Sequence, residues 1–230
     1  VYKRQRLGFG RMDISGMIKT PPIRFSVTSD DLEERPGELK AAYQCILQVP
    51  SLLAIASHKL TGLIGRHETV QDILSNIVLQ LAMLHSYTDV RLICLLKEQD
   101  RVRFGWLRWL PHTFSPDRSR RLVACTEQEH AGVLSYLLDV LRARQEEESN
   151  AERSLPYYVV VCTDPNILYN HAVYRYLTSS AEYHVQFLLA YERLELLPNE
   201  CNFLIQADES FCGAFRMDEN RSETDIVTFD

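Results

Sequence analysis

The chain has 230 residues, of which 46% are hydrophobic and 24% are charged, as expected for a globular protein with a full core. Its length favours one α/β sheet with additions over two separate domains. A formal net charge of −6 argues against a nucleic-acid-binding protein, because phosphate contacts need clustered Lys and Arg. The apolar stretches fall short of the ~18 residues that a transmembrane helix requires.

The six cysteines are widely spaced, and several lie inside apolar runs such as LICLL and YVVVC. They form neither a CxxC pair nor a regular pattern, so a disulfide framework or a zinc site is not indicated. We predict that all six are buried, reduced side chains in a cytosolic protein.

The first 50 residues show an irregular pattern with few clear elements. The alternation at Ile23–Val27 suggests a short strand, and Pro21–Pro22 and Glu34–Gly37 are typical of turns. Residues 1–6 are basic, which fits either a solvated linker or the cytosolic flank of an upstream membrane span. Since the sequence starts at Val1, we expect it to be a piece of a longer protein.

The main domain is expected over residues 51–230, with residues 1–50 as a linker and short strands joined to its sheet. The apolar run Leu60–Ile64 ends at Gly65 and is followed by helical periodicity over Glu68–His85 and a buried strand over Val90–Leu96. This order predicts a βαβ unit and hence a parallel sheet. The alternation continues with predicted strands at Arg121–Cys125, Tyr157–Cys162, Tyr183–Ala190, Asn202–Gln206 and Gly213–Met217, and helices at Glu127–Glu147 and Pro165–Leu177.

A phosphate-binding loop would be expected between the first strand of this unit and its helix. Such a loop needs about eight Gly-rich residues, a Lys for the β- and γ-phosphates and a Ser or Thr for magnesium. The turn here reads Gly65, Arg66, His67, Glu68 and Thr69. It lacks the Lys and is too short, and Glu68 would compete with phosphate for the helix N-terminus. Thr69 matches the magnesium-binding hydroxyl, and Arg66 is a candidate anion ligand.

Proteins with such a phosphate-binding loop also have a strand that supplies a carboxylate ligand to magnesium. This strand ends in Asp-Glu after four hydrophobic residues. Here Thr163 and Asp164 follow Tyr158–Cys162. A threonine does not replace a carboxylate at a hard divalent cation. Asp164, which precedes Pro165, also fits an N-cap before a helix, and this is the interpretation we favour. We therefore expect no catalytic residue, no metal site and no bound cofactor, with ATP and magnesium only if the altered loop still functions.

An aromatic segment lies between the two halves of the chain. It contains Trp106, Trp109, Leu110, Pro111 and His112. These residues either pack a loop onto the sheet or form a contact surface for a neighbouring module, since Trp is favoured at interface centres.

Five segments together resemble the FtsK/SpoIIIE-like ATPases of type VII secretion, the EssC/EccC family, over nearly the whole chain. They are Arg6–Gly10, Leu79–Val90, Trp106–His112, Leu155–Val161 and Leu197–Cys201. The match is to the domain between the membrane helices and the first complete ATPase module, where the nucleotide site is degenerate to varying degrees. The resemblance implies a P-loop NTPase-like (RecA/FtsK-like) α/β fold, with a mostly parallel sheet flanked by helices and a short β-rich N-terminal extension.

The resemblance also implies a function for the chain. It would be a pseudo-ATPase domain at the cytoplasmic face of the bacterial membrane, coupling the membrane region to downstream ATPase modules of the same chain. Other type VII secretion membrane components and further copies of the chain are the implied partners. The alternatives are a weak or partner-completed ATPase and, least favoured because of the acidic charge, a DNA-translocating module.

Overall fold

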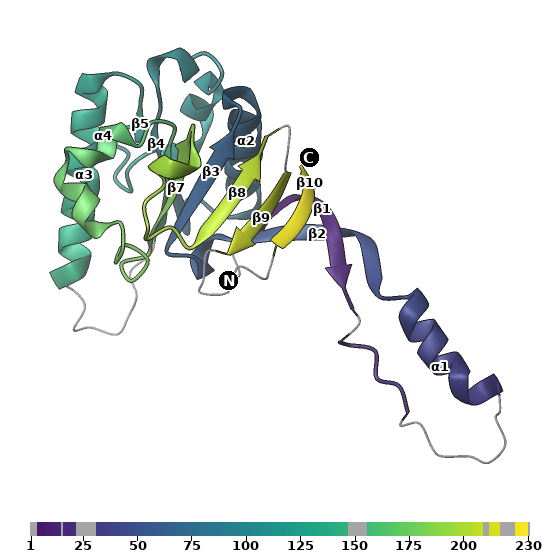
Figure 1. The fold of residues 1–230 in the computed structure, drawn as a ribbon. Coiled ribbons are helices and arrows are strands. Elements are labelled where there is room, and N and C mark those ends of the chain that lie inside the picture. Colours follow the sequence, from purple (N-terminus) through teal and green to yellow (C-terminus); the bar gives the residue numbers. More distant parts are fainter. Residues whose placement is uncertain are drawn as a thin grey trace.

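The computed structural model describes residues 4–14, 16–21, 31–146, 156–208, 212–216 and 224–229. A twisted sheet runs through the molecule, with helices on both faces of one part and a hairpin at the other end (Figure 1). The strands are β1 (Arg4–Asp13), β2 (Cys45–Ala54), β3 (Leu60–Gly65), β4 (Val90–Leu95), β5 (Val123–Ala124), β6 (Tyr157–Cys162), β7 (Val185–Tyr191), β8 (Phe203–Ala207), β9 (Cys212–Arg216) and β10 (Thr224–Phe229). The helices are α1 (Asp31–Ala42), α2 (His67–Leu84), α3 (Glu127–Glu146) and α4 (Asn166–Tyr169).

The described strands form a sheet in the order β2-β1-β10-β9-β8-β3-β7-β6-β4-β5. The part from β8 to β5 is parallel throughout, and the part from β9 to β2 is antiparallel. The first parallel strand, β3, lies between β7 and β8. The strands β4 to β7 are added on one side of β3, and β8 is added on the other side. The expected α/β fold with a mostly parallel sheet is therefore confirmed.

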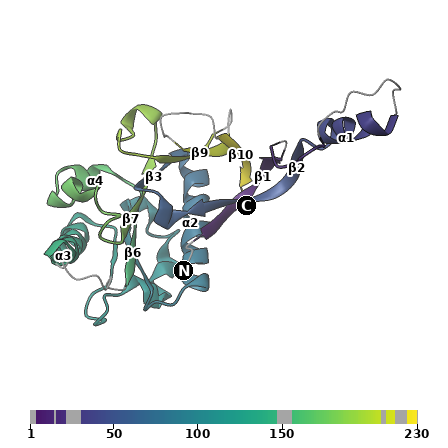
Figure 2. The same cartoon turned by 90° about the horizontal axis from the view of Figure 1, so that it is seen from below.

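Two hydrophobic layers explain why the parallel strands read as continuous apolar runs. Val159 and Val161 point to the layer that contains α2, whereas Tyr158 and Val160 point to the layer that contains α3. Because successive side chains of a strand face opposite sides, a strand covered on both faces must be apolar at every position. Figure 2 shows α2 and α3 on opposite sides of the parallel strands.

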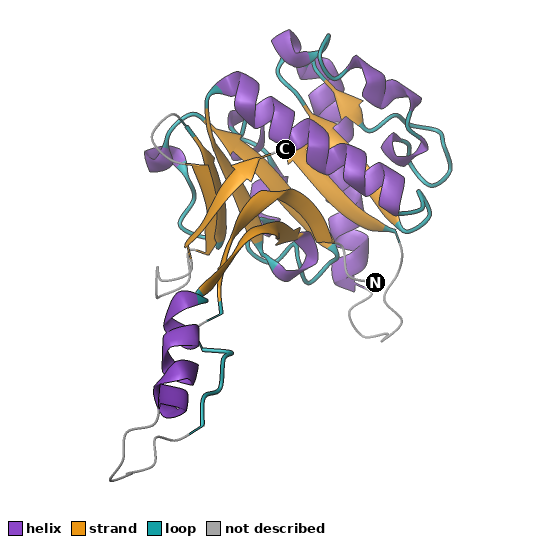
Figure 3. Cartoon of the chain, turned by 90° about the vertical axis from the view of Figure 1, so that its right-hand side faces the viewer, coloured by secondary structure: helices purple, strands orange, loops and turns teal. Residues whose placement is uncertain are grey.

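The N-terminal part differs from the short strands that we expected. β1 and β2, of ten residues each, form a hairpin that carries α1 away from the sheet (Figure 3). The predicted turn at Glu34–Gly37 is wrong, because Pro36 lies inside α1. Pro36 has no backbone N–H and so removes one hydrogen-bond donor from the interior of α1. The strand expected at Ile23–Val27 lies outside the described residues, and the boundary expected at residue 50 falls within β2.

Two further predictions need correction. The helix expected over Pro165–Leu177 is interrupted after α4, because His171 has an extended backbone and restarts the chain as a 3₁₀ turn. The cysteines carry no disulfide, but only four are buried; Cys212 is exposed and Cys45 is half-buried, since both lie in the outer antiparallel strands. Burial raises the pKa of the Cys94 and Cys162 thiols to about 12, so both are protonated at neutral pH.

Among the helices in the described part of the chain, none combines the length and hydropathy needed to cross a bilayer.

Candidate functional site

The sequence-predicted residues meet at the carboxyl edge of the parallel strands. β3 ends at Gly65 and β6 ends at Cys162, and both strands run in the same direction with β7 between them. The carboxyl edge next to a crossover strand is where α/β proteins of this type bind ligands. The edge therefore contains both the turn after β3 and the pair Thr163 and Asp164.

The turn after β3 is very short. β3 ends at Gly65 and α2 starts at His67, so Arg66 alone connects them. Arg66 has an extended backbone (φ −60°, ψ 138°), and its carbonyl accepts the first helical hydrogen bond, from the amide of Val70 at 3.0 Å. A one-residue connection does not provide the roughly eight-residue cradle that a nucleotide triphosphate requires. Glu68 is exposed in the first turn of α2, and Thr69 is half-buried there.

Gly65 is explained by packing against the neighbouring strand. Its φ is +155°, and a Cβ atom at this position would lie 2.1 Å from the carbonyl oxygen of Ala207 in β8. A side chain here would therefore collide with backbone that cannot move away cheaply. The glycine allows β3 and β8 to pair up to their ends, as the Gly65–Ala207 register shows.

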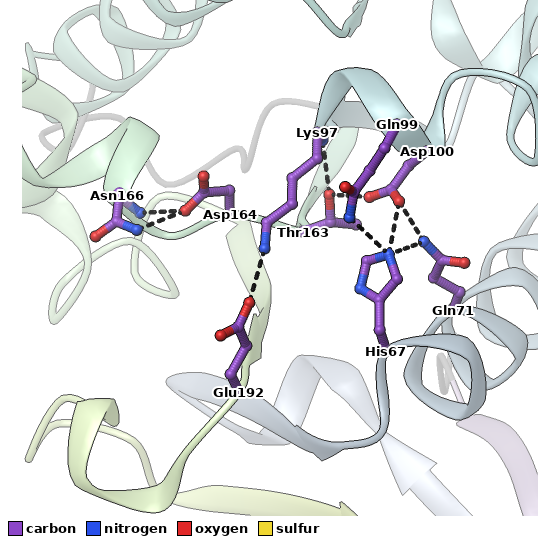
Figure 4. Close-up of polar contacts among 9 residues, drawn as sticks. All are labelled: His67, Gln71, Lys97, Gln99, Asp100, Thr163, Asp164, Asn166 and Glu192. Carbon is purple, nitrogen blue, oxygen red and sulfur yellow. Dashed lines mark hydrogen bonds and ion pairs between the residues drawn. The ribbon is translucent and has the colours of Figure 1, made fainter.

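A buried carboxylate links the two halves of the edge. Asp100, which follows β4, is only 1% exposed. Its Oδ2 accepts a 2.7 Å hydrogen bond from the Thr163 hydroxyl, and its Oδ1 lies 2.9 Å from Nε2 of His67 (Figure 4). Gln71 donates to the same Oδ1 through its side-chain amide. Both oxygens of Asp100 thus have partners within the protein, as a buried carboxylate requires.

The hydroxyl of Thr163 and the charged groups near it also have partners within the protein. The Thr163 hydroxyl accepts a 2.9 Å hydrogen bond from the amide of Lys97, and the Lys97 ammonium lies 3.1 Å from Glu192 after β7. Asp164 turns the other way, and its carboxylate accepts from the amide of Asn166 (3.1 Å) at the start of α4. Figure 4 shows this separation of Asp164 from the Asp100 cluster. The described residues contain no group of three His, Cys, Asp or Glu placed to hold a metal ion.

The pattern search missed Gln71, Lys97, Asp100 and Glu192. The sequence contains a signal for two of these residues, Lys97 and Asp100. They belong to a polar run that follows a buried strand, and the end of that strand was expected at the same edge of the sheet. Its partners were not visible, since His67 and Thr163 lie 33 and 63 residues away from Asp100 in the chain. Only the strand order brings them together.

The aromatic segment does not contribute to this edge. Trp106 and Leu110 pack against the core, and His112 is buried with Nε2 2.9 Å from the carbonyl oxygen of His85. Trp109 is 74% exposed, with the Arg108 guanidinium 4.9 Å from its ring centroid. Most side chains of the segment therefore pack inward, whereas Trp109 and Pro111 are exposed, and a contact with a neighbouring module stays a prediction.

The parallel sheet, its crossover at β3 and the polar carboxyl edge define the class of protein: an α/β domain with a mostly parallel sheet covered by helices on both faces. The fold comparison agrees. The cytoplasmic domain of the type VII secretion ATPase EccC from Thermomonospora curvata superimposes with a TM-score of 0.64, at 9% identity, over 99% of this chain and 26% of that one.

Sequence comparison narrows the class to one family, although a scan of protein families found no match. The ESX secretion system protein EccC of Geobacillus thermodenitrificans is 30% identical over 179 residues, 77% of this chain. The type VII secretion system protein EssC of Staphylococcus aureus is 23% identical over 99% of it. The chain spans only 12% and 15% of these two relatives. The chain belongs to the EssC/EccC family of type VII secretion proteins.

Proposed function

We propose that this domain is a pseudo-ATPase that works as a structural coupler within a type VII secretion motor. The single observation that carries the proposal is the connection between β3 and α2, which consists of Arg66 alone. Backbone amides of a longer Gly-rich turn would otherwise enclose the β- and γ-phosphates. The degenerate phosphate loop Gly65–Thr69 instead passes directly from a packed strand into a helix.

The polar network at the same edge supports this proposal. Thr163 stands where the magnesium-binding carboxylate is expected, and its hydroxyl is already shared between Asp100 and the amide of Lys97. Lys97, a cation at this edge, pairs with Glu192. Rearranging these groups around a nucleotide would leave the buried Asp100 without its donors, at a cost of about 1–3 kcal/mol for each lost partner.

The coupling role is based on the relatives. The chain corresponds to a small part of the long EccC and EssC proteins, and several ATPase domains are described for solved members of the family. We infer that the domain lies at the cytoplasmic face of the membrane in a membrane-anchored protein. There it would connect the membrane region to downstream ATPase modules and contact other secretion components, or further copies of itself.

Calorimetric titration of the purified chain with Mg-ATP, and with ADP alongside, tests the proposal. We expect no heat of binding up to millimolar nucleotide, because the edge offers neither a phosphate cradle nor a magnesium ligand. Micromolar binding would contradict the proposal. If that binding were lost in Arg66→Ala and Thr69→Ala, and turnover were lost in Asp164→Asn, the domain would instead be a weak or partner-completed ATPase.

A further inference from the structure

A groove follows the outer edge of the sheet at β5, away from the Asp100 cluster. It consists of two cavities of about 470 and 530 Å³ that share Arg121, Val123 and Glu129 as lining residues. β5 is the last strand in the sheet order, next to α3 (Figure 1). We call this feature the β5 groove.

The floor of the β5 groove is apolar. Leu96 and Phe104 line the first cavity and Val133 of α3 lines the second; all three are buried. Val102, at the rim of the first cavity, is 92% exposed. Since the three floor residues are already buried, Val102 provides the apolar surface that a ligand would cover, and covering it is favourable.

The walls of the β5 groove are basic, although the chain as a whole carries a net charge of −6. Four exposed arginines line it against one glutamate, Glu129. Glu129 is already engaged: one oxygen pairs with Arg101 at 3.1 Å, and the other accepts from the amides of Cys125 (2.8 Å) and Thr126 (3.1 Å). The groove therefore retains a strong excess of positive charge.

The remaining three arginines lack a carboxylate partner among the described residues. Arg108 stacks on Trp109, Arg121 stacks on Phe114 with 4.8 Å to its centroid, and Arg120 forms no ion pair in this part of the chain. Aromatic stacking positions Arg108 and Arg121 but leaves their charge uncompensated. Their fork-shaped donors match the geometry of a carboxylate.

The backbone of β5 adds a directional element. The carbonyls of Leu122 and Ala124 accept hydrogen bonds from the amide of Cys94 in β4 (2.8 Å) and from that of Leu96, which follows β4 (2.9 Å). Because successive residues of a strand point their backbone groups to opposite sides, the amide and carbonyl of Val123 face away from β4. Val123 lines both cavities, so these groups lie at the open edge where another strand can pair.

We propose that the β5 groove binds an extended acidic peptide segment of a partner protein. The segment pairs with Val123 as an added strand, presents carboxylates to the arginines and covers the exposed Val102 with an apolar side chain. Strand addition of this kind derives affinity from backbone hydrogen bonds and specificity from alternate side chains. The proposal is independent of whether the domain binds nucleotide.

Fluorescence anisotropy with a fluorescein-labelled seven-residue peptide of alternating Glu and Val tests the proposal on the purified chain. We expect saturable binding that weakens with added salt. A Lys-Val peptide of the same length should bind at least about tenfold more weakly, because its charges repel the arginines. N-methylation of alternate backbone amides removes hydrogen-bond donors from the Glu-Val peptide. When the methylated amides are those that pair with Val123, binding should weaken by a similar factor.

Variants of the protein complete the test. Arg108→Glu combined with Arg120→Glu should weaken binding of the Glu-Val peptide at least about tenfold, whereas Arg175→Glu, an exposed arginine outside the groove, should change it less than about twofold. Equal binding of the Glu-Val and Lys-Val peptides, or no binding at millimolar peptide, would overturn the proposal. A labelled thymidine dodecanucleotide that binds as tightly as the Glu-Val peptide would also overturn the proposal, because the groove would then recognise polyanions in general.

Discussion

Gly65 shows how one residue type can serve two different purposes. In the sequence it is the glycine at which a phosphate loop would begin. In the structure it is required because the carbonyl of Ala207 in β8 passes within 2.1 Å of where a Cβ would lie. The two explanations predict different consequences of mutation, since a packing glycine affects folding whether or not a ligand binds.

We expect Gly65→Ala to lower the free energy of unfolding by about 2–4 kcal/mol, because it combines a backbone clash with an unfavourable φ. Gly132→Ala in α3 is the matched control, since nothing lies within 4 Å of its Cβ position. This control should be neutral or stabilise the protein by up to about 1 kcal/mol, because alanine favours a helix. Urea denaturation measures both, and equal effects of the two substitutions would contradict the packing role.

Among the elements, the aromatic segment divides its two tryptophans between core and surface. Trp106 packs against the hydrophobic layer that contains α2, whereas Trp109, at the end of the same 3₁₀ turn, is 74% exposed. A spacing of three residues in sequence does not distinguish these positions. The chain becomes extended at Leu110, so Trp109 is the last residue of the turn.

We expect Trp106→Ala to cost about 2–4 kcal/mol of stability, since it removes a large side chain from the core boundary. Trp109→Ala should change stability by less than about 0.5 kcal/mol, as for most exposed positions. Chemical denaturation of the two variants, followed by circular dichroism, checks this. A comparable loss in both would mean that Trp109 also packs in solution.

At the scale of the whole molecule, the C-terminal strand joins the N-terminal hairpin to the main sheet. β10 pairs with β9 on one side and with Gly8–Gly10 of β1 on the other. The base of the hairpin has a second anchor, because the backbone of Arg6 forms two 2.7 Å hydrogen bonds with the side chain of Gln80 in α2. Leu7 and Leu53 are buried in the same region.

Deleting residues 217–230 should therefore affect the hairpin unevenly. We expect amide exchange in Gly8–Gly10 to accelerate at least about tenfold, because β10 no longer pairs with them, while Arg4–Leu7 and the strands β4 and β6 remain protected. Hydrogen–deuterium exchange with mass spectrometry measures this. Unchanged protection of Gly8–Gly10 would mean that β2 alone holds this segment.

Much of this molecule was predictable from local patterns. The helix α2, the strands β4 and β6 and the helix α3 lie within one or two residues of their predicted ranges, because helical and strand periodicities are imposed by nearby side chains. The phosphate-loop region and Thr163 were also recognisable as altered, since a missing Lys or carboxylate is visible in the sequence itself. The hairpin was less predictable, because Pro36 within α1 contradicts the usual preference.

The sequence by itself determined the class of fold, the family and the position of the candidate edge, because each follows from periodicity or from short runs of residues. Only the tertiary structure decided that Asp100 joins His67 to Thr163 and that Thr224–Phe229 supply a strand between β9 and β1. It also decided that β5 leaves a basic groove open at the edge of the sheet. These features depend on the order of the strands, which is fixed by hydrophobic contacts between residues far apart in the chain and has no local periodicity to reveal it.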